Sequence, residues 1–454
     1  MSRRLALLLA LTATLLGAAC SDSGGEAADE EITVTETGEA SSSGVTTSTS
    51  TSTSVAATPD AEPADFSGRG PYPVGQVDLE LGPEHTVAVF YPVDPGAVPS
   101  DAEPYSYNGE DILDPAVSAI LPGSLSAEVA PADTWVGAPA SDDGPFPTVL
   151  HSHGFSGNLR FANQHNAAIA SWGYVVAAVD HPERGLRSIL DSFLAPAAEE
   201  GERADEYLDS DQLVAALDLL AETGASADSP LAGVVDTERV ATEGHSAGGS
   251  ASGTAAYDPR VDLWIGQAPG TPLPPDADLD AFTEEVEEDG QTRSRLYVDA
   301  LFDANEPPDV PSLIIAAEGD TVIELDRVER TFDWLASPKR MMVIADSGHA
   351  VFVDPCVPIR EEGGLGVFME GLGLDPTTVP LVELGENGCL PSDADPELVW
   401  GLIDHVTVAQ LNQVFDLHAD VAIASLEPGY IEATFPGLLG QYATGEPTDE
   451  NGPE

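Results

Sequence analysis

The sequence predicts an α/β domain with a mostly parallel sheet of about eight strands flanked by helices. Three observations support this fold class. Apolar runs of strand length alternate with helix-like segments along the chain. Reactive side chains follow directly after three of the predicted strands, as is typical of the carboxyl ends of strands in parallel sheets. The 454 residues, of which 42% are hydrophobic, can also bury a substantial core.

The first 66 residues precede this domain. Residues 1–20 combine a basic start, an apolar run and small residues before Cys20, which predicts a lipoprotein-type signal peptide lipidated at Cys20. Simple secretion after a different cleavage is the alternative. Residues 21–66 are rich in Ser, Thr and acidic residues and predict a flexible tether. We therefore expect an extracytoplasmic protein, either a bacterial membrane lipoprotein or a secreted one, with its domain over 67–440 and a frayed tail over 441–454.

The domain begins with two alternating segments, Val77–Leu81 and Thr86–Tyr91, which predict an opening hairpin. Further strands are expected near residues 147, 174, 238, 262, 312 and 340. In the segment 211–222, Leu213, Ala216, Leu217 and Leu220 fall on one face, which predicts a helix packed on the sheet. The acidic insertion Pro272–Pro311 is expected to form a partial cap, a surface excursion being the alternative.

The most specific motif is GHSAGG, Gly244–Gly249, which follows the strand-like run Val240–Thr242 and leads into a segment of small residues. A G-x-S-x-G turn between a strand and a helix exposes the serine hydroxyl at the edge of a sheet. The motif therefore predicts that Ser246 is a nucleophile. In a glycine-rich chain the same letters can also form an ordinary turn.

A serine nucleophile needs a histidine base and a carboxylate that orients the histidine. The apolar run Pro311–Ala317 is followed closely by Asp320, and the run Met341–Ala345 by His349. Both follow predicted strands, so they are expected at the same sheet edge as Ser246.

Other residues compete for these roles. Glu318 is near enough to replace Asp320 as the acid, whereas Asp346 stands too close to His349 in the chain. His405 and His418 fall in a helix-like stretch, where a structural or surface role is expected.

Acyl transfer also needs donors for the developing oxyanion, and the backbone N–H groups of Ala247 and Phe155 are the candidates. Gly154 allows the backbone of Phe155 to approach closely. The pair His151 and His153 suggests a metal site, but no third ligand follows at short spacing. We expect these histidines to pin the oxyanion loop, and we expect no metal or cofactor.

These segments carry a family resemblance. PTVLHSHGFSGN, RFANQHNAAIASWG and YVVAAVDH resemble the platelet-activating-factor acetylhydrolase and dienelactone hydrolase branches of the α/β-hydrolase superfamily. The chain also resembles bacterial polyester hydrolases, through DQLVAALDLL and VVDTERVATEGHS before the elbow serine and through LIIAAEGDTVI around the acid. The likeness runs from about Gly68 to about Leu417.

The resemblance implies an α/β-hydrolase fold and a serine hydrolase that cleaves carboxylic esters, small or polymeric, through an acyl-enzyme, and the signal peptide predicted over residues 1–20 implies that it is exported. It places the nucleophile at Ser246, the acid at Asp320, the base at His349 and the oxyanion amides at Phe155 and Ala247. The alternatives are polyester or lactone substrates, and a non-catalytic surface lipoprotein that uses the fold as a binding module. Polyester hydrolases commonly have methionine where Ala247 stands, and dienelactone hydrolases typically have cysteine at the nucleophile position. The oligomeric state stays open.

Once Cys20 is assigned to the lipid, Cys356 and Cys389 are left in the exported domain, where disulfides persist. They are expected to pair and to brace the excursion 357–391 after His349, a free reactive thiol being the alternative. That excursion could also form a wall of the substrate pocket.

The formal net charge of −63 excludes nucleic acid as a partner, because a polyanion would be repelled. Self-repulsion of this size is screened by salt, so the composition favours a saline environment. A gradual accumulation of acidic residues in an exported protein, without any role in salt tolerance, explains the negative charge equally well.

Overall fold

The computed structural model describes residues 61–82, 85–112, 128–187, 209–288, 291–371, 376 and 380–445. The predicted signal peptide 1–20, with Cys20, lies outside the described residues, and so does the predicted tether up to residue 60. Among the described residues, no helix is both long and apolar enough to span a bilayer.

The end of the predicted tether belongs to the folded domain. Phe66 is buried, contacts the edge of Trp172 and donates its backbone N–H to His405 Nδ1 at 3.1 Å. The expected domain start at residue 67 is therefore slightly late, because one aromatic side chain at the end of a polar segment is enough to anchor it in the core.

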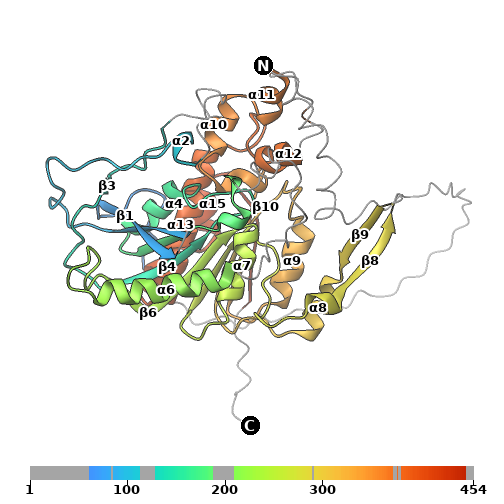
Figure 1. Cartoon of the computed structure of the whole chain (residues 1–454), viewed down its shortest axis with the longest axis horizontal. Coiled ribbons are helices and arrows are strands. Elements are labelled where there is room, and N and C mark those ends of the chain that lie inside the picture. Colours follow the sequence, from blue (N-terminus) through green and yellow to red (C-terminus); the bar gives the residue numbers. More distant parts are fainter. Residues whose placement is uncertain are drawn as a thin grey trace, which may run out of the picture.

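A ten-stranded sheet forms the centre of the molecule (Figure 1). Its strand order is β12-β11-β10-β7-β6-β4-β5-β2-β1-β3, and the six strands from β11 to β5 in that order are parallel. These six are β4 Phe146–Ser152, β5 Val175–Val179, β6 Val235–His245, β7 Leu263–Gln267, β10 Ser312–Ala317 and β11 Lys339–Ile344. The antiparallel hairpin β1 Val74–Gly82 and β2 His85–Pro92 extends the sheet beyond β5.

All eight expected strand positions carry strands, and the described residues add two more to this sheet. β3, Thr134–Val136, pairs with β1, and β12, Leu439–Gly445, pairs antiparallel with β11. The expected domain end at residue 440 is therefore wrong. Tyr442 and Ala443 pack against the core, so the segment gains both a ladder of hydrogen bonds and apolar contacts.

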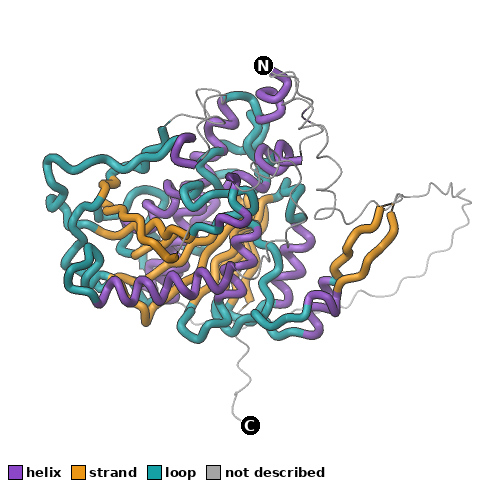
Figure 2. Tube along the Cα trace, in the orientation of Figure 1, coloured by secondary structure: helices purple, strands orange, loops and turns teal. Residues whose placement is uncertain are grey.

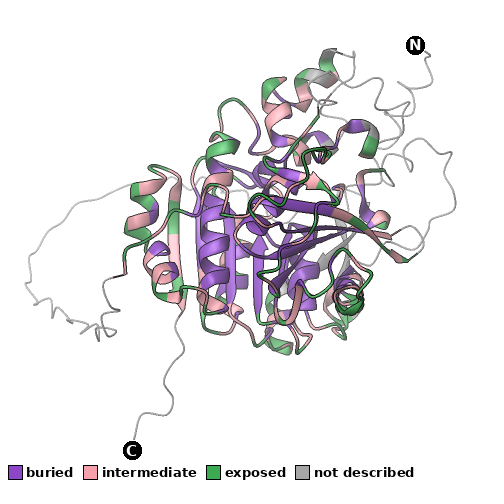
Figure 3. Cartoon of the chain, turned by 90° about the vertical axis from the view of Figure 1, so that its left-hand side faces the viewer, coloured by how far each residue is buried: buried purple, intermediate pink, exposed green. Residues whose placement is uncertain are grey.

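Helices cover both faces of the sheet (Figure 2). α4, Asn163–Ser171, and α13, Pro396–Val414, share one apolar cluster with the sheet, whereas α6, Asp209–Ala225, α7, Ala247–Ala255, and α9, Leu325–Trp334, share the other. The strands alternate accordingly: in β10, Leu313 and Ile315 belong to the first cluster and Ile314 and Ala316 to the second. Figure 3 shows the buried residues concentrated in this sandwich. In α6, Leu213, Ala216, Leu217 and Leu220 are buried, which confirms the expected packing face.

The acidic insertion contains η2, Leu279–Phe282, the antiparallel hairpin β8 Thr283–Glu288 and β9 Gln291–Leu296, and α8, Val298–Ala304. Figure 1 shows this hairpin lying to the side of α8 and α9. The partial cap stays a prediction.

Lys339, the only lysine of the chain, is the first residue of β11. It therefore lies at the amino-terminal ends of the parallel strands, opposite the carboxyl ends that carry the predicted site. Its Nζ donates to the carbonyl oxygens of Phe332, at 2.7 Å, and Asp333, at 3.0 Å. These carbonyls belong to the last turn of α9, where a cation interacts favourably with the helix dipole.

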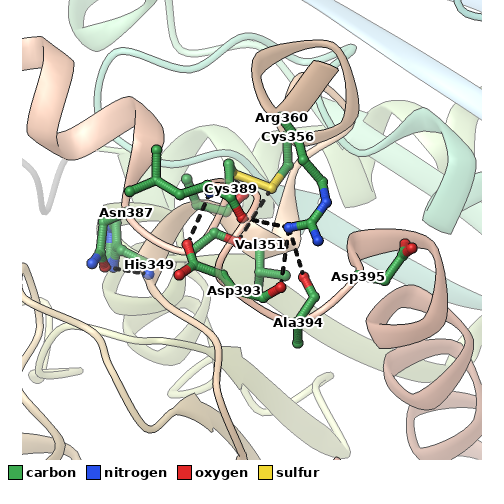
Figure 4. Close-up of a disulfide and its surroundings, with 12 residues drawn as sticks. His349, Val351, Cys356, Arg360, Asn387, Cys389, Asp393, Ala394 and Asp395 are labelled. Atoms are coloured by element: carbon green, nitrogen blue, oxygen red, sulfur yellow. Dashed lines mark hydrogen bonds between the residues drawn. A yellow bond between two sulfur atoms is a disulfide. The ribbon is translucent and has the colours of Figure 1, made fainter. Parts of the chain in front are cut away.

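Short helices follow the 3-10 turn η3, His349–Phe352: α10 Cys356–Glu361, α11 Leu365–Gly371 and α12 Pro380–Glu386. Cys356 and Cys389 form a disulfide and are fully buried (Figure 4). Beside it, the guanidinium of Arg360 donates to the carbonyl oxygens of Leu390 and Asp393. The crosslink and the arginine together fix the two ends of the excursion. Among the described residues, the other α-helices are α2 Gly109–Ile112, α14 Ala419–Ser425 and α15 Pro428–Thr434.

We predict that replacing both cysteines, Cys356→Ser with Cys389→Ser, lowers the free energy of unfolding by roughly 3 to 4 kcal/mol, because the crosslink restricts the unfolded chain. Urea unfolding of the variant and the wild type under non-reducing conditions measures the difference. The wild type with reductant is the matched control. Equal free energies of unfolding with and without the crosslink would contradict the prediction.

Candidate active site

The turn between β6 and α7 is strained. Ser246 adopts φ 58° and ψ −120°, a conformation that non-glycine residues rarely take. A Cβ at Gly244 would lie 2.2 Å from the carbonyl oxygen of Gly248, and one at Gly248 would lie 2.1 Å from the carbonyl oxygen of Ser152. Only glycine fits at both positions, so the local sequence permits the sharp bend that a nucleophile elbow requires.

The structure brings the three predicted site residues together. Ser246 Oγ lies 2.8 Å from His349 Nε2, and His349 Nδ1 lies 2.8 Å from Asp320 Oδ2. All three side chains are buried, and they follow the carboxyl ends of β6, β11 and β10. The second oxygen of Asp320 accepts the backbone N–H groups of Val322 and Ile323, each at 2.8 Å, which fixes the carboxylate.

These contacts define how the histidine is protonated. An ionised carboxylate can only accept, so His349 Nδ1–H donates to Asp320. His349 Nε2 is then the acceptor for the Ser246 hydroxyl. The arrangement is able to remove a proton from the serine.

The competing residues lie elsewhere. Glu318 is exposed, and its carboxylate accepts the backbone N–H of Asp346, which is exposed as well. His405 is buried in α13, where its Nε2–H donates to the carbonyl oxygen of Ser425 at 3.0 Å. His418 is exposed at the start of α14. The structure therefore places Asp320, and not Glu318, beside the histidine.

The two predicted oxyanion donors flank the serine. Ala247 is the first residue of α7, where backbone N–H groups have no acceptor within the helix. A Cβ at Gly154 would lie 3.3 Å from Ser246 Cβ, so the loop that carries Phe155 touches the elbow. No backbone hydrogen bond within the described part of the chain occupies the Phe155 N–H. Its side chain is 37% exposed at the surface of the loop.

A buried arginine that the sequence analysis missed holds this loop. Arg184, in the 3-10 turn Pro182–Arg184, donates to the carbonyl oxygen of His153 and pairs with Asp209 at the start of α6. It also donates to Ser152 Oγ at 2.9 Å. Charge-assisted bonds of this kind fix a loop more firmly than neutral ones.

Two neutral histidines complete the support. Burial lowers the pKa of His153, and it lowers the pKa of His181 far below its usual value, with Arg184 adding to the second effect. His153 Nε2 accepts the backbone N–H of His181 at 3.1 Å, and His153 Nδ1–H donates to the carbonyl oxygen of Gly154 at 2.8 Å. His153 thus contacts the predicted oxyanion loop, as expected. His151 instead faces Glu243, with 3.5 Å between His151 Nδ1 and Glu243 Oε2. The described residues contain no group of side chains that could hold a metal ion.

A buried ionic cluster lies beneath the elbow, and the sequence analysis missed it as well. His165 of α4 donates from Nε2 to Glu243 of β6 at 3.0 Å and from Nδ1 to Asp404 of α13 at 2.5 Å. Gln267 of β7 donates to the same oxygen of Glu243 at 2.9 Å. The cluster ties both helices to the strand that carries Ser246.

The pKa values show that His165 and Glu243 of this cluster are both charged. Burial alone would lower the pKa of His165, but Glu243 and Asp404 raise it to about 10. Burial would raise the pKa of Glu243, but His165 and His151 lower it to about 2. At Asp404 burial outweighs the imidazolium and raises the pKa. The His165–Glu243 ion pair is therefore intact at neutral pH.

The histidine of the motif, His245, supports the predicted base. Its Nε2–H donates to the backbone carbonyl of His349 at 2.8 Å, and the two ring centroids lie 4.8 Å apart. Burial, reinforced by the neighbouring His349, holds the pKa of His245 well below its usual value. The ring is therefore a neutral spacer between the elbow and the loop of His349.

The mostly parallel sheet, the flanking helices and the strained elbow together fit an α/β-hydrolase fold. A family model described as PET hydrolase-like matches residues 197–273, which include α6, β6, the elbow, α7 and β7. No curated protein matches the chain. The match supports an ester-cleaving hydrolase of the α/β-hydrolase type. It covers 211–220 and 234–246, two of the three segments on which the resemblance to polyester hydrolases rests, whereas the third, 313–323, lies outside it.

We predict that the ionic cluster makes stability depend on pH in two windows. The raised pKa of His165, about 10 against 6.5, means that its contribution is complete below about pH 6.5 and is lost as pH rises toward 10. The lowered pKa of Glu243, about 2 against 4.5, means that its contribution is present above about pH 4.5 and is lost as pH falls toward 2.

Urea unfolding at neutral and at alkaline pH tests the first window. The double variant His165→Gln with Glu243→Gln should lose less stability than the wild type on this change of pH, because the titrating pair is gone. The exposed His418→Gln is the matched control and should keep the wild-type dependence. Equal pH dependence in the double variant and the wild type would refute the assignment.

Proposed function

We propose that this protein is an exported serine hydrolase that cleaves carboxylic esters through an acyl-enzyme on Ser246. The observation that carries the proposal is the continuous chain of contacts from Ser246 Oγ through His349 to Asp320, each link 2.8 Å long, at a strained elbow. The PET hydrolase-like match supports the same reaction class.

In the proposed reaction, His349 Nε2 takes the hydroxyl proton as Ser246 attacks the ester carbonyl, and Asp320 stabilises the imidazolium that forms. The N–H groups of Phe155 and Ala247 bind the oxyanion of the tetrahedral intermediate. His349 then gives the proton to the leaving alcohol. Water activated by the same imidazole attacks the acyl-enzyme and releases the carboxylic acid.

Two observations favour polyesters as a second candidate substrate class beside soluble esters. The matching family model is described as PET hydrolase-like. In addition, the aromatic side chain of Phe155 is 37% exposed on the predicted oxyanion loop, next to the elbow. Exposed aromatic rings bind aromatic groups by stacking.

We expect Ser246→Ala to abolish turnover and labelling by a fluorophosphonate probe while leaving the fold intact, because the proposed reaction forms the acyl-enzyme on this hydroxyl. Hydrolysis is measured on chromogenic esters of increasing acyl length and, as release of soluble products, on poly(ethylene terephthalate) film. The exposed Ser226→Ala is the matched control and should behave as the wild type. Turnover retained in Ser246→Ala would reject the nucleophile, and a wild type that neither reacts nor labels would favour the binding module.

We further propose that Cys20 is lipidated and that the segment 21–60 tethers the domain to the bacterial membrane, which the N-terminal sequence supports. In a bacterial host that processes lipoproteins, the wild type should fractionate with membranes. Cys20→Ser should carry no lipid and should be depleted from the membrane fraction. Incorporation of a labelled fatty acid distinguishes the two, and a wild type without label would disprove the anchor.

A further inference from the structure

Asn387 occupies a junction in the disulfide-braced segment (Figure 4). α12 ends one residue before it, Gly388 follows at φ 90°, and the next residue, Cys389, is crosslinked to Cys356. The side chain is only half-buried, and nothing in the sequence marks it, because Asn-Gly is an ordinary turn signal.

The amide of Asn387 contacts both loops that carry the predicted acid and base. Its Oδ1 accepts the backbone N–H of His349 at 2.6 Å and that of Thr321 at 3.3 Å. Its Nδ2–H donates to the carbonyl oxygen of Gly319 at 3.1 Å. Gly319 and Thr321 are the two neighbours of Asp320, so one side chain holds the acid loop on both sides of the carboxylate.

The backbone of the same residue adds a fourth contact, because the carbonyl oxygen of Asn387 accepts the N–H of Ala350 at 2.7 Å. A Cβ at Gly348 would lie 2.6 Å from Asn387 Oδ1, and a Cβ at Gly388 would lie 2.4 Å from the backbone nitrogen of Gly348. The close approach of the segment to the base loop therefore depends on glycine on both sides of the contact.

The chemistry of the position selects an amide. It needs an acceptor for two N–H groups and a donor for a carbonyl, and only Asn and Gln present both on one planar group. Aspartate would lack the donor and would place a second carboxylate beside Asp320. Alanine would leave the N–H of His349 and the carbonyl of Gly319 without these partners.

The segment that follows Asn387 is fixed by the disulfide and by Arg360. Cys389 is joined to Cys356, which begins α10 shortly after the turn that contains His349. Arg360 of α10 bonds the carbonyl oxygens that follow the crosslink, as Figure 4 shows. The disulfide thus fixes the asparagine relative to the base loop itself.

We infer that Asn387 is a positioning residue that locks the loops of Asp320 and His349 together, and that the Cys356–Cys389 disulfide keeps it in place. The inference deepens the proposed esterase and rests on that function for its catalytic meaning. A hydrogen-bonded acid and base must stay within a fraction of an ångström of their working geometry, and small displacements cost large factors in rate. Asn387 supplies that constraint through its hydrogen bonds to the backbones of the two loops.

The test compares Asn387→Ala with the wild type in kinetics and in proton NMR. We expect kcat for a soluble ester to fall on the order of 10- to 100-fold with KM little changed, because the catalytic geometry loosens while substrate binding does not. The low-field proton signal of the bond from His349 Nδ1–H to Asp320 should shift or broaden. Asn305→Ala, in the insertion far from the site, is the matched control and should change neither readout.

Two further variants separate the positioning role from a loss of folding. Asn387→Asp keeps an acceptor but loses the donor, and it should change kcat and the low-field signal in the same direction even if Asn387→Ala does not fold. The pair Cys356→Ser with Cys389→Ser, measured where it is folded, should show a smaller change of the same kind. An unchanged low-field signal in the asparagine variants overturns the positioning role, whatever happens to kcat, and an unchanged signal in the cysteine pair overturns the part played by the disulfide.

Failure of the proposed function gives a different result. If the wild type neither hydrolyses esters nor labels with the fluorophosphonate probe, yet its low-field signal responds to Asn387→Ala, the positioning of His349 stands and the esterase does not. If the wild type is active and the asparagine variants match it in both readouts, the esterase stands and the inference falls.

Discussion

The whole site depends on close backbone packing at the elbow. Ser246 reaches its strained conformation because the backbones at Gly244 and Gly248 touch neighbouring carbonyl groups where no side chain would fit. The parallel sheet then decides what the serine meets. Since β10 and β11 run in the same direction as β6, the residues that follow them arrive at the same edge.

Much of this site could be predicted from local sequence, because Ser246, Asp320 and His349 each follow a strand and each belongs to a short recognisable pattern. The strands of the large sheet that escaped prediction are the short β3 and the partly polar β12, whose pairing depends on neighbours distant in the chain. Each of the eight predicted strands carries its own apolar pattern, so it could be predicted without knowledge of such neighbours.

The supporting residues were beyond sequence reasoning for a physical reason. His165 and Asp404 are 239 positions apart and become partners only when α4 and α13 pack on the same face of the sheet. Arg184 is an ordinary charged residue in the sequence, yet the fold buries it against the oxyanion loop. Protonated His165 and Arg184 are therefore two buried cations in a chain whose net charge is −63.

The environment of Lys339 has a practical consequence. This side chain is the only lysine amine of the protein, and it begins β11, whereas His349 follows the other end of that strand. Amine-directed coupling to a solid support would thus act through a single side-chain point on the face remote from the serine. Molecules attached there would share one orientation, with the reactive edge directed toward the liquid.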